Sequence, residues 1–128
     1  QFFVPLDCSK EAIPIILKKI TDAGKAPSLS VLKKFGEGNN NYLSFPGSGY
    51  SLAMDFKRDR TLFPLLAEID DLVLAYGGRQ YLAKDARMSE EVFKQSYENW
   101  EKFVAVKSKY DPKNIFASQQ SKRLGLTK

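Results

Sequence analysis

The spacing of apolar residues predicts a regular alternation of strands and helices over residues 1–83. Apolar positions recur at helical intervals in two segments, residues 9–24 and 61–77. Four other segments are rich in aromatic residues or alternate between apolar and polar positions, as strands do: residues 1–5, 28–35, 50–56 and 79–83. Strand, helix, strand, strand, helix, strand is the order of a ferredoxin-like βαββαβ unit. The sequence therefore predicts an α+β fold, with an antiparallel sheet and both helices on one face.

After this unit the pattern changes to helices alone. Ser89, followed by Glu90 and Glu91, is typical of a helix start. Apolar residues continue on one face until Asp111-Pro112, so we expect a single helix between these points. Residues 114–128 are short, basic and partly apolar, which predicts a tail that docks on another surface. The complete prediction is a ferredoxin-like unit followed by C-terminal helices.

Composition is that of a globular chain and excludes several kinds of chemistry. The 128 residues are 43% hydrophobic and 27% charged, enough to bury a core without disulfides. Cys8 is the one cysteine and cannot form an internal disulfide. The sequence has no histidine, which removes imidazole-based catalytic triads and zinc sites with histidine ligands, so we expect no metal site. Chemistry here must use Lys, Tyr, Asp or Glu, or a bound cofactor.

The net charge of +5 comes from the second part of the chain. Residues 1–78 hold nine basic and nine acidic side chains, whereas residues 79–128 hold eleven and six. Such a segment suits either a phosphate or nucleic-acid footprint or a solvated helix face. Ferredoxin-like sheets that bind RNA stack bases on paired aromatic residues of the central strands. Only Tyr50 and Phe56 stand near these positions, so we expect no nucleic-acid partner and keep an RNA- or ligand-binding module as an alternative.

A polar loop separates the second and third predicted strands, over residues 36–49. It lacks the third glycine of a dinucleotide-binding fingerprint and the Gly-Lys-Ser/Thr of a phosphate-binding loop. A loop of this length in a compact domain is often functional. We therefore interpret it as either the rim of a substrate site or a plain connector. The chain starts at Gln1, directly on a predicted strand, and we expect it to be a fragment of a longer protein.

Several short motifs, taken together, resemble a known family. They are GGRQYLAKDAR at residues 77–87, YDP at 110–112, FAS at 116–118 and RL at 123–124, preceded by SVLKKFG at 30–36, LSFP at 43–46 and GYSLAMDF at 49–56. In this order and spacing the chain is similar to FAD-linked oxidoreductases of the vanillyl-alcohol oxidase superfamily. Within it, the motifs most resemble those of the decaprenylphosphoryl-β-D-ribose oxidases, with sugar-lactone and alditol oxidases as more distant relatives.

The resemblance implies a division of the chain into two parts. Residues 1–78 correspond to the C-terminal half of a substrate-binding cap domain. Residues 79–128 correspond to a C-terminal segment that completes an FAD-binding domain, whose remainder is absent from this chain. FAD is then the cofactor of the full-length protein, and the missing N-terminal FAD domain is the main partner. We expect the isolated chain to bind no FAD and to be inactive.

Two residues next to the flavin are implied by the same resemblance. Lys84 matches a lysine that lies between flavin and substrate, and it is the expected catalytic residue. Tyr81 matches a neighbouring residue on the flavin, so both are expected to contact the cofactor. A fixed cation there makes physical sense, because it favours the negative charge that develops on a flavin accepting hydride.

Four further positions correspond to the substrate pocket. Lys33 and Phe35 match cap residues that line it: a lysine suits a sugar phosphate as a point charge, and the phenyl ring gives an apolar wall. Ser51 and Ala53 stand where the mycobacterial members that the chain resembles have asparagine and cysteine. These two departures leave the sugar and the lipid carrier open.

The reaction implied is oxidation of a secondary hydroxyl of a sugar, with hydride passing to the flavin. The substrate would be a lipid-phosphate-linked sugar such as decaprenylphosphoryl-ribose, an arabinan precursor of the cell wall. A partner short-chain reductase would then complete an epimerisation. An aldonolactone or alditol oxidase that uses oxygen is the alternative. The resemblance implies a location in the cytoplasm or at the inner membrane as a peripheral protein.

Overall fold

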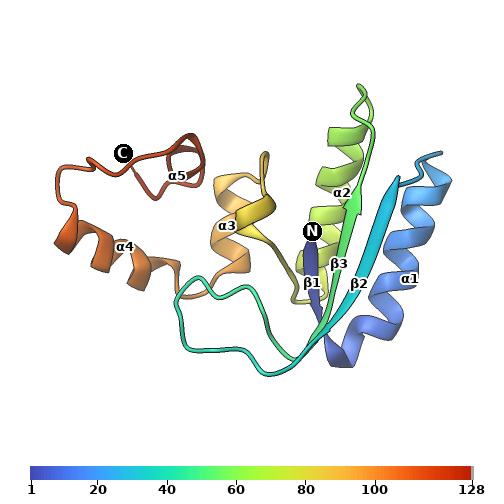
Figure 1. The fold of residues 1–128 in the computed structure, drawn as a ribbon, viewed down its shortest axis with the longest axis horizontal. Helices are drawn as coiled ribbons and strands as arrows, with labels where there is room; N and C mark the ends of the chain where they lie inside the picture. The colour runs from blue at the N-terminus through green and yellow to red at the C-terminus, as the bar shows by residue number, and fades with distance from the viewer. Residues whose placement is uncertain (128) are drawn as a thin grey trace.

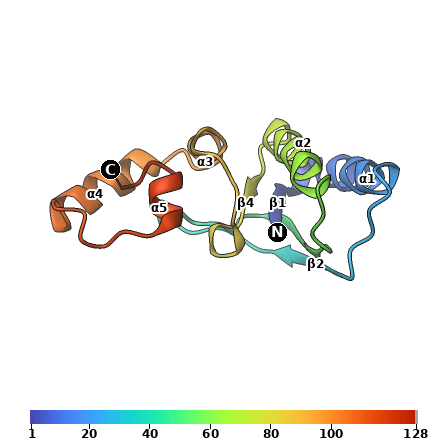
Figure 2. The same cartoon turned by 90° about the horizontal axis from the view of Figure 1, so that it is seen from above.

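The structure, a computed structural model, describes residues 1–127 and confirms the predicted α+β fold. One antiparallel sheet has the strand order β2-β3-β1-β4, and its strands are β1 (Phe2–Pro5), β2 (Leu29–Phe35), β3 (Gly49–Asp55) and β4 (Arg79–Gln80). Helices α1 (Leu6–Asp22) and α2 (Leu62–Ala75) cover the same face of this sheet (Figure 2). This is the ferredoxin-like arrangement that the apolar pattern predicts.

Alternation along the central strands decides which side chains enter the core. Val4 of β1 and Leu52 of β3 point towards the helices, where they pack with Ile16 and Ile69. Directly paired residues of antiparallel strands share a face, and successive residues alternate. The sheet therefore has one face covered by helices and one open face, and the odd-numbered residues of β1, β2 and β3 lie on the open face.

Two glycines shape the turn between α2 and β4. Gly77 has a φ of +66°, a conformation that favours glycine. At Gly78 an added Cβ would lie 2.3 Å from the Phe3 carbonyl oxygen. Any side chain at residue 78 would therefore push β4 away from β1, so this glycine is required for the fourth strand to pair.

The predicted start of the first helix was wrong. The apolar spacing predicts a helix that starts at residue 9, but α1 begins at Leu6, immediately after β1. Pro5 already has a φ of −58° and an extended ψ, so the chain passes directly from the strand into the helix. The Ser9 hydroxyl lies inside the helix and donates to the Leu6 carbonyl. Pro14 consequently lies in the interior of the helix.

The predicted strand over residues 79–83 is shorter than expected. Only Arg79 and Gln80 pair with β1, and residues Leu82–Lys84 form a short 3₁₀ turn, η1. The Tyr81 carbonyl accepts the Lys84 amide at 3.0 Å, which turns the chain out of the sheet. Lys84 therefore lies on a turn and not on a strand.

The single helix expected after Ser89 is two helices. α3 (Glu90–Ser96) begins as predicted, with the Ser89 hydroxyl accepting the Val92 amide, but it ends at Tyr97. The Tyr97 side chain is buried and donates to the Gln80 carbonyl at 2.6 Å, which fixes this residue against the sheet. α4 (Trp100–Tyr110) then runs in a different direction (Figure 1). No proline or glycine marks the break, so the apolar pattern did not reveal it.

The C-terminal part extends sideways from the sheet, and its ribbons lie beyond α2 and β4 in both views (Figures 1 and 2). Its last helix is α5 (Gln119–Arg123), capped reciprocally by Ser118 and Ser121. A second apolar cluster joins α3 to the end of the chain and consists of Met88, Phe93, Tyr97 and Leu124. Within residues 1–127, none of the helices is long and apolar enough to span a membrane.

Candidate functional site

The four predicted substrate residues lie on the open face of the sheet. Lys33 of β2 is paired directly with Ser51 of β3, and Val31 with Ala53. Phe35 comes two residues after Lys33 on β2, so its side chain lies on the same face, and it pairs with Gly49. The structure thus places all four predicted residues on the same side of two adjacent strands, away from the helices. Lys33 is exposed, whereas Ser51 is fully buried.

Gln1 joins this group and was missed by sequence reasoning. Its side-chain nitrogen Nε2 donates to the Ser51 hydroxyl at 2.9 Å. Its oxygen Oε1 is buried and accepts no hydrogen bond from residues 1–127. The sequence contains no local signal for this contact, because only the pairing of β1 with β3 brings residue 1 beside residue 51.

A chain of aromatic rings runs across the open face from Phe35 to Tyr81. The Phe35 ring meets Phe45 edge to face, with centroids 5.8 Å apart, and Phe3 packs against both rings. The Phe45 ring then stacks on Tyr81 with centroids 4.5 Å apart. A predicted substrate residue and a predicted flavin residue are therefore connected through Phe45. Phe45 belongs to the LSFP motif of the loop, but its role in the site was not predicted from the sequence.

Arg79 fastens this loop to the sheet. Its guanidinium donates to the carbonyls of Phe45 and Pro46, at 2.9 and 3.1 Å, and lies 4.8 Å from the centre of the Phe3 ring. Burial lowers the pKa of Arg79 from its ordinary value, yet an arginine stays charged in proteins. Leu43 packs against the second apolar cluster. The second half of the loop is thus docked, while the residues before Leu43 are exposed.

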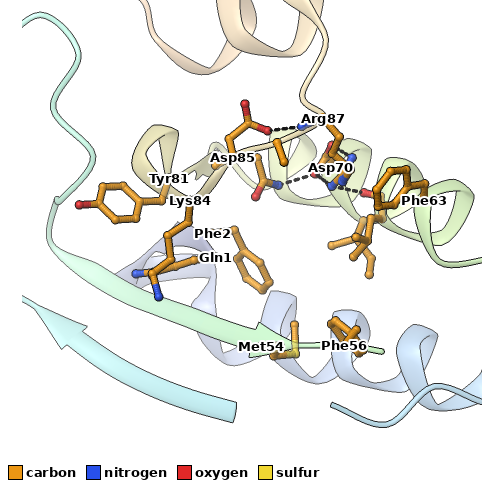
Figure 3. A pocket seen from close by; sticks show the side chains of 14 residues that line it. Gln1, Phe2, Met54, Phe56, Phe63, Asp70, Tyr81, Lys84, Asp85 and Arg87 are labelled. Carbon is orange, nitrogen blue, oxygen red and sulfur yellow. Dashed lines mark hydrogen bonds and ion pairs between the residues drawn. The ribbon is translucent and has the colours of Figure 1, made fainter. Parts of the chain in front are cut away.

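Lys84 extends from η1 beside this face. Its side chain lies close to Gln1, and both residues line one cavity (Figure 3). The acidic groups nearest in sequence and space already have partners: Asp85 pairs with Arg123, and Asp70 pairs with Arg87. Within residues 1–127 the Lys84 amine has no acidic partner. It is a cation available to a group outside the described chain.

The cavity beside Lys84 has a volume of about 210 Å³ and lies between the sheet, α2 and the turn after β4 (Figure 3). Asp70 forms its polar wall, where it accepts hydrogen bonds from Arg87 and Gln80. Burial raises the pKa of Asp70, although the Arg87 guanidinium acts in the opposite direction. Because these charges satisfy one another, this wall supports the turn and offers no free acid or base.

Tyr81 and Lys84 are the two predicted flavin contacts, and the structure places them on the same turn. Tyr81 is half-buried and offers an aromatic surface, and Lys84 offers an ammonium without an acidic partner among residues 1–127. Two side chains are too few to hold a large cofactor.

Comparisons with known proteins identify the family of this chain. Residues 5–124 match the family described as D-arabinono-1,4-lactone oxidase. The chain is 37% identical over 126 residues to "Decaprenylphosphoryl-beta-D-ribose oxidase" of Mycolicibacterium smegmatis, which covers 98% of the chain and 27% of that protein. It is 36% identical over 112 residues to "Uncharacterized protein in mprA 5'region" of Streptomyces coelicolor, covering 87% of the chain and 30% of that protein.

The chain therefore spans less than a third of the length of either relative. The family match begins at Pro5, the last residue of β1, and ends at Leu124, just after α5, so it includes η1 with Lys84 and the strands β2 and β3 that carry Lys33 and Ser51. Both the strand face and the turn beside it thus lie within the matched region. On this match, the chain belongs to the D-arabinono-1,4-lactone oxidase family.

Proposed function

We propose that this chain is the C-terminal part of an FAD-dependent oxidoreductase that oxidises a secondary hydroxyl of a sugar. The observation that supports this most strongly is the unpaired Lys84 amine beside the open face that carries Lys33, Phe35 and Ser51. An enzyme that removes hydride from a hydroxyl needs a fixed cation where negative charge appears. Family membership supplies the reaction class.

The division at residue 78 is part of this proposal. Residues 1–78 form half of a substrate-binding cap, and residues 79–128 complete an FAD-binding domain. The outer edge of β2 pairs with no strand among residues 1–127, and Leu29 and Leu32 on it are more than half exposed. Ile115 and Phe116, which come after α4, are 74% and 79% exposed. Apolar surfaces of this kind are usually covered in the complete protein.

Lys84 has an electrostatic role in the proposed reaction. When bound, FAD supplies the acceptor for the hydride. The Lys84 ammonium would stabilise the negative charge that develops during transfer and hold the reacting hydroxyl by a hydrogen bond, while the hydroxyl proton passes to water or to a base outside the described residues as the carbonyl forms. Tyr81, supported from behind by the Phe45 ring, provides a flat surface that keeps water from this edge.

The open face binds the substrate. Lys33 attracts a phosphate as a point charge, and Phe35 provides an apolar wall. Ser51 is fully buried and accepts a hydrogen bond from Gln1 Nε2, so its part in this site is to hold Gln1 at the open face. The Ala53 side chain has no polar atom, so the open face at this position is less polar than one that carries a cysteine. These features favour a sugar attached to a lipid phosphate, such as decaprenylphosphoryl-ribose.

A second candidate function is oxidation of a free aldonolactone or alditol with oxygen. The family description favours it. Such a substrate has no phosphate, so Lys33 would then contribute little to binding. An RNA-binding sheet is disfavoured, because Tyr50 pairs with Val4 on the helix-covered face and Phe56 packs against the core.

The experiment that tests this proposal is steady-state kinetics of the full-length enzyme with two variants. Lys84→Ala should reduce turnover by about a hundredfold or more with flavin content retained, since oriented donors in dry sites contribute about 2.7–4 kcal/mol. Lys33→Ala should raise the Michaelis constant for a prenylphosphoryl ribose analogue and leave a free lactone unaffected. Near-normal turnover of Lys84→Ala would contradict the role of Lys84, and equal effects of Lys33→Ala on both substrates would contradict phosphate binding.

The proposal extends to the fate of the oxidised product. A keto-sugar on a lipid phosphate is a substrate for a short-chain reductase, and such a partner would complete an epimerisation in the supply of arabinan precursors. An enzyme acting on a lipid-linked substrate would work at the inner membrane as a peripheral protein or in the cytoplasm. Accumulation of the keto-sugar by the purified enzyme, and its loss when reductase and nicotinamide cofactor are added, tests this step.

A further inference from the structure

The turn that carries Lys84 has few contacts of its own. η1 contains three residues, and its internal hydrogen bonds run from the Lys84 amide to Tyr81 and from the Asp85 amide to Leu82. A turn this short does not hold a fixed geometry by itself. The position of the Lys84 amine must therefore be set by contacts from other parts of the chain.

Asp85, the next residue, is the centre of these contacts. Its oxygen Oδ1 accepts the amides of Arg87 and Met88 at 2.9 and 2.7 Å, and its oxygen Oδ2 accepts Arg123 at 2.8 Å. Burial acts to raise the pKa of Asp85, but the two amides and the Arg123 guanidinium outweigh it and lower the pKa. The carboxylate therefore stays ionised, and both of its oxygens are in use.

The partners of this turn come from α5, far away in the sequence. Arg123 donates to Asp85 with one nitrogen and to the Met88 carbonyl with the other. Gln120, one turn earlier in α5, donates to the Leu82 carbonyl at 2.6 Å. The two side chains thus hold the backbone on both sides of Lys84, before it at Leu82 and after it at Asp85 and Met88.

The opposite side of the turn is held by α2. Arg87 donates to both carboxylate oxygens of Asp70 and to the Leu66 carbonyl (Figure 3). α2 is part of the main core, so this side is rigid. α5 is a helix of five residues, fastened through its cap and through Leu124, which is 1% exposed. The contacts from α5 can therefore be removed by substitution without disturbing the main core, which makes them the ones to test.

We propose that Arg123 is a positioning residue for the Lys84 amine, acting through Asp85. This inference rests on the proposed function, because it requires Lys84 to act on bound substrate or flavin. Arg123 itself does not line the cavity beside Lys84 and takes no part in the reaction. Loss of its guanidinium frees Asp85 and loosens the turn, so that the Lys84 ammonium no longer meets the developing charge in one fixed position.

A double-mutant cycle in the full-length flavoenzyme tests this directly. The measured quantity is the rate at which substrate reduces bound flavin without oxygen, monitored by the loss of flavin absorbance. Arg123→Met should slow this step on the order of tenfold, with the Michaelis constant little changed. In the Lys84→Ala background the same substitution should have no further effect, because the group that it positions is gone.

Two other variants serve as controls. Lys122→Met removes the same charge from the neighbouring, exposed position of α5 and should leave the rate unchanged. Arg123→Lys keeps the charge but loses the forked geometry, and it should fall between wild type and Arg123→Met. A second readout is independent of turnover: hydrogen exchange at the Arg87 and Met88 amides should quicken in Arg123→Met, while amides of α2 stay protected.

The outcomes separate this inference from the proposed function. If Lys84→Ala slows flavin reduction and Arg123→Met does not, the positioning role is wrong and the proposed function stands. If the two effects simply add, Arg123 acts on the fold in general, which also overturns the inference. If Lys84→Ala leaves the rate unchanged, the proposed role of Lys84 is wrong, and the positioning role is overturned with it. Flavin content of each variant shows that it is folded.

Discussion

Residues 1–78 and 79–127 are held together by different forces. The first region has nine buried residues in one continuous apolar cluster between the sheet and α1 and α2. The second has a cluster of four, and the rest of its structure depends on hydrogen bonds to carboxylates. The stability of an apolar core does not depend on the charge of any one side chain. A carboxylate that accepts several hydrogen bonds, in contrast, loses these contacts when it is neutralised or replaced. The Lys84 turn belongs to the second region.

Three aspartates define the shape of that second region. Asp70 in α2 binds Arg87, Asp85 binds Arg123 and two amides, and Asp111 binds Lys107 together with the amides of Ile115 and Phe116. Each is nearly buried and accepts more than one hydrogen bond. They link segments that share little apolar surface, so the geometry beside Lys84 is fixed by polar contacts of definite direction.

The largest expected effect is in the apolar region. Ile16→Ala should lower the free energy of unfolding by about 2–5 kcal/mol, since Ile16 is fully buried between helix and sheet. Ile15→Ala removes the same atoms at a position that is 40% exposed, and it should cost much less. Denaturant unfolding monitored by circular dichroism measures both. Similar losses for the two variants would show that this core is not the main source of stability.

A smaller effect is expected from a change of charge in the second region. Asp85→Asn should destabilise residues 79–127 by about 1–3 kcal/mol, because Arg123 loses its ionic partner in a partly buried place. Asp71→Asn, at an exposed position of α2, should have almost no effect. Hydrogen exchange resolved along the chain is the measurement. Loosening of α1 and β3 as well as α5 would mean that the two regions do not behave separately.

The smallest expected effect is a difference in acid stability between residues 1–78 and residues 79–127. The pKa values of Asp85 and Asp111 are lowered on folding, so both ionised carboxylates stabilise the folded state. This stabilisation is complete above the ordinary pKa of 3.8 and is lost as the pH falls through the lower pKa values of the folded state. The pKa of Asp70 is raised, so its protonation favours the folded state at the same time. Trp100, the sole tryptophan, packs against the second cluster. Its fluorescence should change at a higher pH than the circular dichroism of the whole chain; coincident transitions would contradict this.

Much of the first region was predictable from the sequence, because apolar spacing reports directly on burial. The alternation of Leu52 and Met54 with Ser51 and Ala53 predicts a strand, and the pairing of β2 with β3 in the structure then puts the four substrate positions on one side. The predicted start of the first helix was wrong because Pro5 both ends β1 and directly precedes α1, with no connecting loop between them. Strands, helices and their faces are local features, and the spacing of apolar residues within one segment predicts most of them.

The second region was less predictable for a physical reason. The end of α3 depends on a hydrogen bond from Tyr97 to Gln80, and the turn depends on Arg123 meeting Asp85. Such contacts join residues that are far apart in the sequence. The positions of these residues follow no repeating pattern, so the sequence does not reveal the contacts. Phe45 and Gln1 were missed in the same way, since both are placed by pairing between distant segments.

The separation between Asp85 and Arg123 also bears on the order of events during synthesis. The two residues are 38 positions apart, and α5 must be made before the turn gains its outer contacts. At about 5–20 residues per second, translation leaves an interval of seconds in which the sheet and its two helices are complete but Asp85 has no arginine. A nascent chain arrested in that interval would carry Lys84 on an unsupported turn. We expect the turn to acquire its final geometry late, as α5 docks, rather than when the sheet forms.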